Sequence, residues 1–465
     1  MNDAAVGKPR PPVVSPAVPA PLRPPWLRVL TAILLVASPA ALLLAPHLAE
    51  AGVAVLAIGG LYLRLRPKAA PCDPRRLRLL TLLTLGFFAA ALATVVLSDR
   101  SPSALRGLWN LREFLAAPLL GLLLYQARIE DRLVLLSAQL GAPLLLAMAA
   151  WQLLHGVGRP GGEVNPLIFG ILSLLLGFFS LVRLPLETVP QRALSLFAFA
   201  CGCTAAVISQ SRAVWLVSVP LLACLLWVWR QAGCLDRRLA LGVAAFFLAL
   251  AAMLAQTPLV QHRIELAVAN YRAWQTRAEW RNPLGERLLM WRSGLSAAAH
   301  RPLLGWGPGH TQQAAASQLA DPRQQRFVLG LNHLHNQYLN ALVAAGVPGL
   351  LAPVLLLFVP LTVFLRRRAG TGLLLYDGLG ALLCSGYALA GLTNQTFGDD
   401  TLNLFFVLFL SLTLPRSVSA PQPGEPAPDT LNRLGRWAAA AAAARLPPCL
   451  HPVHRRPPAA RRPHP

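Results

Sequence analysis

Two histidines and three asparagines lie close together in residues 332–340, which read Asn-His-Leu-His-Asn-Gln-Tyr-Leu-Asn directly before a long apolar run. His335 can take up or release a proton near neutral pH, because the usual pKa of imidazole is about 6.5. His333 would point elsewhere if His335 begins a helix. Asn336 and Asn340 are four residues apart and would share a helix face, where they could hold a sugar hydroxyl or bond to neighbouring helices. The pair of histidines could bind zinc, but no third ligand is apparent nearby.

Two arginines have positions suited to binding an anion. Arg212 ends the Ser-Gln-Ser-Arg turn 209–212 and is followed at once by an apolar run, where an ionisable group indicates function. The hydroxyl of Ser211 could add a hydrogen bond to an anionic oxygen, whereas the simpler alternative is an arginine that reaches the lipid headgroups. Arg287 lies near the start of a predicted helix, where free N–H groups and the helix dipole favour anions. Its alternative is an ion pair with a nearby glutamate on the loop surface.

Other polar groups are predicted on the same side of the membrane. The stretch 394–400 ends in Asp399 and Asp400, and such a pair could bind a divalent metal or form a solvated loop. Further candidates cannot be ranked from spacing, and they are Trp109, Arg112, Glu113 and Asn165.

The composition is that of a helical membrane protein. Hydrophobic residues make up 55% of the 465 residues and charged residues only 13%, about half the usual share for a soluble domain. The net charge of +23 comes almost entirely from arginine, with two lysines in the chain. Basic cytoplasmic loops explain this charge better than nucleic-acid binding does. The seven cysteines show no metal-ligand spacing.

Apolar runs of about 20 residues recur along the chain, which is the length that crosses a bilayer as a helix. They predict an all-α polytopic protein with twelve spans, at 26–46, 48–64, 79–97, 112–127, 132–154, 166–183, 193–209, 213–229, 238–256, 336–365, 372–393 and 402–414. The tenth span could be kinked at 346–349.

The short turns after the even-numbered spans are basic, which places them in the cytoplasm. They carry Arg64, Arg66, Lys68, Arg75, Arg76, Arg78, Arg128, Arg132, Arg183, Arg192, Arg230, Arg237, Arg238, Arg366, Arg367 and Arg368. Both termini then lie inside: residues 1–25 as an N-terminal segment and 415–465 as a disordered tail rich in Pro, Ala and Arg, with a possible short helix at 438–444. No cleavable signal peptide is evident. Residues 257–335 form an outer loop between spans nine and ten.

The outer loop 257–335 departs from the charge rule. It holds nine arginines against four acids, a net charge of +5, and no lysine. Arginine pairs bidentately with phosphate, so the loop predicts phosphate-bearing partners, the alternative being arginines at the headgroup surface. Segments 262–280 and 285–299 are predicted amphipathic helices separated at Asn282-Pro283, with tryptophans as interfacial anchors. A glycine-rich tight turn is predicted at 305–309.

In their order and topology, these features resemble the O-antigen ligase/polymerase superfamily, and the O-antigen ligases within it. The resemblance covers most of residues 26–415 and rests on the turn 209–212, the large outer loop, the turn 305–309, and His-Asn-x-x-Leu at 335–339 before Gly346 and Gly349. No single motif is very specific.

The resemblance implies a GT-C-like glycosyltransferase of the bacterial inner membrane, working on the periplasmic side without cofactor, metal ion or nucleotide sugar. It would join O-antigen from undecaprenyl diphosphate to a lipid A-core sugar in lipopolysaccharide biosynthesis. His335 would be catalytic, and Arg212 and Arg287 would bind the diphosphate. Ser211, Asn336, His333 and Arg112 are possible substrate contacts. Ala345 stands where many relatives have an acidic residue, so that position is not expected to be catalytic here.

The proposed residues fit the chemistry, because permanently charged arginines can stabilise a departing lipid diphosphate. His335 could activate the acceptor hydroxyl, and a single displacement would invert the anomeric centre; alternatively it only positions substrate. Three alternatives remain open: an O-antigen polymerase, a protein O-oligosaccharyltransferase with the same donor, and an anion transporter. The transporter is disfavoured because no internal repeat is convincing and the polar residues gather at the outer face.

Overall fold

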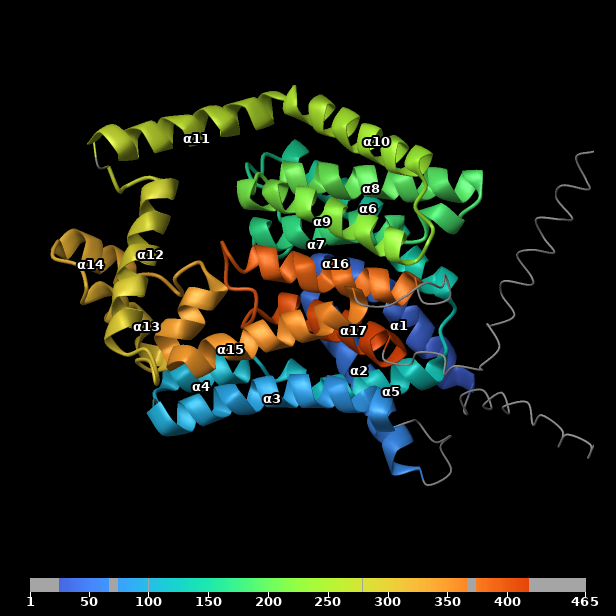
Figure 1. Ribbon diagram of the computed structural model, residues 1–465, viewed down its shortest axis with the longest axis horizontal. Helices are drawn as coiled ribbons and strands as arrows, with labels where there is room; N and C mark the ends of the chain where they lie inside the picture. Colours follow the sequence, from blue (N-terminus) through green and yellow to red (C-terminus); the bar gives the residue numbers. More distant parts are fainter. Residues whose placement is uncertain (1–24, 67–73, 99, 278, 366–373, 418–465) are drawn as a thin grey trace, which may run out of the picture. The chain divides into compact units, whose positions relative to one another are not determined.

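The computed structural model describes residues 25–66, 74–98, 100–277, 279–365 and 374–417, and these residues form helices and no strand. The helices of the first half are α1 (Pro25–Leu44), α2 (Pro46–Leu65), α3 (Pro74–Ser98), α4 (Pro102–Trp109), α5 (Glu113–Ala127), α6 (Asp131–Leu154), α7 (Pro166–Leu181), α8 (Val189–Ile208) and α9 (Arg212–Gln231). The rest are α10 (Arg237–Ala255), α11 (Pro258–Arg277), α12 (Pro283–His300), α13 (Thr311–Ala316), α14 (Pro322–Leu329), α15 (Gln337–Leu365), α16 (Leu374–Ala390) and α17 (Asp400–Ser417). Figure 1 shows their arrangement.

Several helices begin at a polar residue followed by proline. Asn165, Asn282 and Asp321 each accept a hydrogen bond from a backbone N–H in the first turn of α7, α12 and α14. Proline suits the next position because its fixed φ is helical and its missing N–H would have no partner there. Each cap stabilises its helix by about 1 kcal/mol. These local signals are readable in the sequence and fix where the site-bearing helices start.

The chain is an all-α, multi-pass membrane protein. Ten helices of the described residues are long and apolar enough to cross a membrane, and α16 is a shorter apolar helix. Each of the twelve predicted spans overlaps a helix, with α17 corresponding to the twelfth. The fourth begins earlier than predicted, because α4 and α5 together form the candidate span Pro102–Ala127. Helix α7 is the central one: it is almost wholly buried and packs against α6, α8, α9 and α16.

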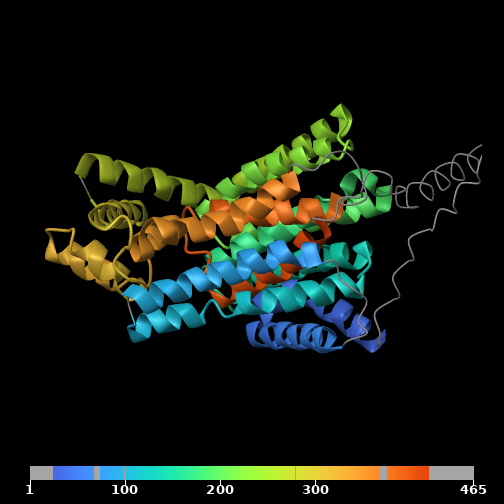
Figure 2. The ribbon, with the colours of Figure 1, turned by 60° about the horizontal axis from the view of Figure 1, so that its bottom comes forward.

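The predicted outer loop contains a second hydrophobic core. Its members come from α12, α13, α14, the segment before α15 and the start of α15, and include Met290, Ala315, Val328, Leu334 and Val343. The two predicted loop helices are confirmed as α11 and α12, although α11 begins at Pro258. Figures 1 and 2 show α11 continuing outward from α10, while α12 turns back to pack on α15. This core gives the outer loop a defined structure, so its side chains have defined positions.

Helix α15 is interrupted at Ala345 and Gly346, at the start of the predicted kink 346–349. Gly346 has φ 64° and ψ −156°, a conformation open to glycine alone. The turn 302–307 docks there: the N–H groups of Trp306 and Gly307 donate to the carbonyls of Val343 and Ala344, both at 2.9 Å. Val347 N–H donates to the Pro302 carbonyl at 2.8 Å. These bonds lock the first two turns of α15 onto the loop, next to residues 332–336.

Some predictions fall on other parts of the chain. Residues 1–24 and 418–465, including the short helix expected at 438–444, lie outside the described residues.

Candidate functional site

The segment before α15 holds His335 in an unusual backbone conformation. Leu334 is fully buried in the second core, while His335 takes a left-handed φ of 49°. The His335 N–H donates to Nδ1 of His333 at 3.1 Å, and the two rings lie 4.3 Å apart edge to face. The helix begins at Gln337, two residues after His335, so the condition under which His333 would point elsewhere is not met. The two imidazoles are packed together because the chain turns sharply between them.

The His335 side chain interacts with the Asn394 amide and is affected by the charge of Arg287. Burial lowers its pKa from the usual value, the positive charge of Arg287 lowers it further, and a hydrogen bond with Asn394 acts in the opposite direction. Burial and the neighbouring His335 lower the pKa of His333 to about 4. Burial and like charge both disfavour the protonated form of a histidine. Both rings are therefore neutral at neutral pH, as a proton acceptor must be.

Asn394 lies in the loop after α16. Hydrogen bonds join this loop to the start of α15, and we call this junction the clasp. The Gln337 side chain accepts from the N–H groups of Thr396 and Phe397 at 3.0 and 2.9 Å. The Asn336 amide donates to the Leu392 carbonyl at 3.0 Å, and its oxygen accepts from the first N–H groups of α15. Asn336, a predicted substrate contact, is thus engaged in fixing this clasp.

Asn340 also has a structural partner. Its side-chain oxygen accepts a hydrogen bond at 3.3 Å from the N–H of Leu334, which precedes Asn340 by six residues. Asn336 and Asn340 could have held a sugar hydroxyl or bonded to neighbouring helices. In the structure both side chains form hydrogen bonds with nearby backbone groups. Together these amides hold the His333–His335 turn in place.

Four arginines gather on the Arg287 side of His335. Burial lowers the pKa of Arg287, and the positive charges of Arg212 and Arg159 lower it further. The pKa of Arg263 is lowered by burial and by the same two neighbours. No carboxylate of the described residues contributes to either shift. The four side chains form a cluster of uncompensated positive charge, called here the arginine cluster (Arg159, Arg212, Arg263 and Arg287).

The turn 209–212 ties this cluster together through Gln210, a residue with a left-handed φ of 58°. The Gln210 amide donates to the Gly158 carbonyl at 2.5 Å, and its oxygen accepts from Arg263 Nε at 3.0 Å. Arg212 donates in turn to the Arg263 carbonyl at 3.5 Å. One glutamine side chain thereby joins the α6–α7 loop, the start of α9 and helix α11.

Ser211 lies at the N-terminus of α9 beside Arg212. Its side chain is buried, and its Oγ has no hydrogen-bond partner among the described residues. Leaving a buried hydroxyl without a partner costs about 1–3 kcal/mol. A ligand oxygen near Ser211 would remove that cost, so its predicted hydrogen bond to an anion stays a prediction.

Arg112 occupies a different environment. It forms ion pairs with Glu113 at 3.1 Å and Asp400 at 3.3 Å, and its guanidinium lies over the Trp109 ring. Asp399 accepts from the Leu402 N–H at 3.1 Å. Across the described part of the chain, no three His, Cys, Asp or Glu side chains are grouped as metal ligands would be. Arg112 therefore carries compensated charge, unlike the arginine cluster.

The structure brings Arg212, Arg287 and His335 together and adds residues that the sequence did not single out. Arg159 lies in the glycine-rich stretch 156–162. Its position in a second loop on the predicted outer side is the feature of the sequence that could have identified it. Arg263 was one of nine loop arginines with nothing to distinguish it. Asn394 was noted only as part of a polar turn.

Comparison with known proteins finds a family similar to the segment that carries most of this site. Residues 197–354 match the family model for O-antigen ligase, and that segment includes Arg212, Arg263, Arg287 and His335. A similar protein from Haemophilus influenzae, itself described as uncharacterized, is 23% identical over 218 residues. That alignment covers 46% of this chain and 54% of the relative, so the chain spans about half the length of this curated relative. Residues 197–354 of this chain, which carry three of the four clustered arginines and His335, are therefore similar to the O-antigen ligase family.

Proposed function

We propose that this protein transfers an O-antigen glycan from undecaprenyl diphosphate to a sugar hydroxyl of the lipid A-core, in the inner membrane of a bacterium. The family match supports a glycosyl-transfer function of the ligase/polymerase type. The observation that carries the finer proposal is the arginine cluster beside a neutral histidine, with no carboxylate among the described groups that shift its pKa values.

The arginine cluster fits a diphosphate. The donor's diphosphate has two negative charges while it bridges lipid and sugar, and it gains a third when the anomeric C–O bond breaks and the oxygen keeps the electron pair. Four permanently charged guanidinium groups, three of them partly buried, would stabilise that added charge more than they stabilise the bound donor. Repulsion among them in the empty site is relieved when the anion binds, and Ser211 would donate to one of its oxygens.

His335 would take the proton from the acceptor hydroxyl as that oxygen attacks the anomeric carbon. A single displacement of this kind inverts the configuration. The base must be neutral before the reaction, and the effects of burial and Arg287 on its pKa meet that requirement. A low pKa also makes it a weaker base, but a diphosphate is a good leaving group and needs only modest help. Asn394 would orient the ring through its hydrogen bond.

Purified protein in liposomes would test this function with a lipid-linked donor and a lipid A-core acceptor. We expect transfer to be lost or cut at least about 100-fold in Arg212→Ala, Arg287→Ala and His335→Ala. Arg292→Ala is the matched control, since Arg292 is an exposed arginine of the same helix as Arg287. Full activity of all three site variants would refute the mechanism.

The same assay separates the related functions by their product. Glycan attached to lipid A-core supports the ligase. A longer polymer on undecaprenyl diphosphate would instead identify a polymerase, and glycan on protein would identify a protein O-oligosaccharyltransferase.

The periplasmic location of the site is part of this proposal. In a background without the native cysteines, Arg292→Cys should react with an impermeant thiol reagent added from the periplasmic side. Arg230→Cys lies at the other end of the spans and should react only from the cytoplasmic side. The reverse pattern would invert the proposed topology.

A further inference from the structure

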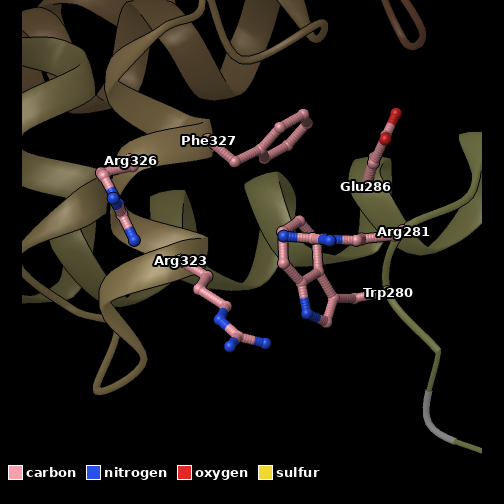
Figure 3. Close-up of a pocket in the computed structure, with 6 residues that line it drawn as sticks. All are labelled: Trp280, Arg281, Glu286, Arg323, Arg326 and Phe327. Carbon is pink, nitrogen blue, oxygen red and sulfur yellow. The ribbon is translucent and has the colours of Figure 1, made fainter.

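A pocket of about 530 Å³ opens beside the N-terminus of α12, and none of its lining residues has an assigned role in transfer. It lies between the segment that precedes α12 and helix α14 (Figure 3). Two aromatic rings, three guanidinium groups and one carboxylate line it: Trp280, Phe327, Arg281, Arg323, Arg326 and Glu286.

The aromatic part of the pocket is held by its surroundings. The Trp280 and Phe327 ring centroids are 5.5 Å apart with the rings tilted by 57°. Asn282 fixes the turn after Trp280 by donating to the Glu279 carbonyl at 2.7 Å and accepting from two N–H groups of α12. Gly285 lies so close that a Cβ there would be 2.7 Å from the Trp280 Cα. The tryptophan is therefore presented by a rigid turn.

The charges of the pocket are unbalanced. Arg323 and Arg326 are three residues apart on α14 and so project from one side of it. Arg281 lies with its guanidinium 5.3 Å from the centre of the Trp280 ring. None of the three forms an ion pair with a described residue, and the one side-chain bond they make within the described chain is from Arg326 Nε to the Pro322 carbonyl at 3.4 Å. With Glu286 as the one acid, the pocket has a net charge of +2, three minus one.

We propose that this pocket binds an anionic sugar residue, bearing a phosphate or a carboxylate, of a glycan substrate. The guanidinium groups would pair with the anion, and Glu286 can accept hydrogen bonds from hydroxyls. The negative face of an aromatic ring attracts the polarised C–H groups of a sugar ring. A free phosphate would leave the rings unused, and a neutral sugar would leave the arginines unpaired.

The pocket adjoins the proposed catalytic site through a shared helical turn. Glu286 and Arg287 are consecutive residues of α12, so their side chains leave the helix about 100° apart. Arg287 joins the arginine cluster and Glu286 lines the pocket. A glycan longer than one sugar could occupy both places at once. This assignment of the ligand to a substrate rests on the proposed function.

Binding to the purified full-length protein in nanodiscs would test the pocket directly. Four probes would be compared by titration: glucose 6-phosphate, glucuronate, glucose and inorganic phosphate. We expect both anionic sugars to bind at least about tenfold more tightly than the other two. Equal binding of glucose would overturn the role of the charges. Equal binding of inorganic phosphate would overturn the saccharide assignment and indicate a simple phosphate or headgroup site.

Variants locate the binding. Trp280→Ala and the double substitution Arg323→Gln with Arg326→Gln should weaken glucose 6-phosphate binding at least about tenfold. Arg272→Gln and Arg292→Gln change exposed loop arginines outside the pocket and should leave it unchanged. Equal losses in the control variants would show a diffuse charge effect and overturn the pocket.

The transfer assay keeps this proposal separate from the proposed function. The pocket variants should raise the KM for one glycan substrate while kcat is retained. If wild-type protein binds anionic sugars but transfers no glycan, the proposed function fails and the pocket stands. If the wild type transfers glycan but binds no anionic sugar, and the pocket variants keep their KM, the pocket proposal fails and the function stands.

Discussion

Replacing Gly346 by alanine should break the contact that locks α15 onto the loop. The residue has φ 64° and ψ −156°, where a side chain costs about 1–3 kcal/mol. A Cβ would also lie 2.4 Å from the carbonyl carbon and oxygen of Leu303, which are backbone atoms and cannot turn aside. Overpacking of this kind costs about 1–3 kcal/mol more. The free energy of unfolding should therefore fall by about 2–6 kcal/mol.

The functional effect of Gly346→Ala follows from the distance constraint on catalysis. The locked turns of α15 hold the clasp that positions His335, and a displacement of about 1 Å can cost about 100-fold in rate. Thermal unfolding of the detergent-purified protein, followed by tryptophan fluorescence, would measure the stability change, and the liposome assay would measure transfer.

Gly86→Ala is the matched control, because Gly86 lies in α3 and a Cβ added there would have nothing within 4 Å of it. Alanine favours a helix over glycine by about 1 kcal/mol, so this variant should be as stable as wild type or more so. Gly305→Ala should resemble Gly346→Ala, since its φ is 66° and its Cβ would lie 2.5 Å from the Ala345 nitrogen. If Gly346→Ala proved as stable as Gly86→Ala, the proposed lock would be refuted.

Three further predictions concern the site. Transfer should be independent of pH near neutrality and fall only below pH 6.5, where His335, whose pKa is lowered, becomes protonated. Asn394→Ala removes a hydrogen bond that raises the pKa of His335, so kcat/KM of this variant should be retained to lower pH than in wild type. An unchanged pH profile in Asn394→Ala would argue against His335 as the base. Gln210→Ala should reduce kcat/KM for the donor by about tenfold without unfolding the protein, because the variant lacks the two Gln210 hydrogen bonds that join the segments of the arginine cluster. A normal donor KM in this variant would contradict the role of Gln210 in joining those segments. Transfer should persist in EDTA, whereas a loss reversed by a divalent cation would redirect attention to Asp399 and Asp400.

The site could be predicted in part because its members mark themselves locally. Arg212 opens an apolar helix after two serines, and His335 precedes one, so both are polar residues where lipid-compatible sequence normally has none. Arg159 and Arg263 carry no such mark, and only folding brings Arg159 close to both Arg263 and Arg287. Arg112 stood out in the sequence, but its charge is compensated by Asp400, a residue far away in the chain, and the sequence does not show this pairing.

The helices could be predicted from the sequence alone, because apolar length and cap-proline pairs such as Asn282-Pro283 act within a few residues. The assembly of the candidate site depends instead on contacts between segments that are far apart in the chain. Left-handed backbone at Gln210 and His335 and the interruption at Gly346 depend on packing against distant segments, which offsets their local cost. The charge state of His335 likewise depends on burial and on Arg287, and those are consequences of which surfaces meet.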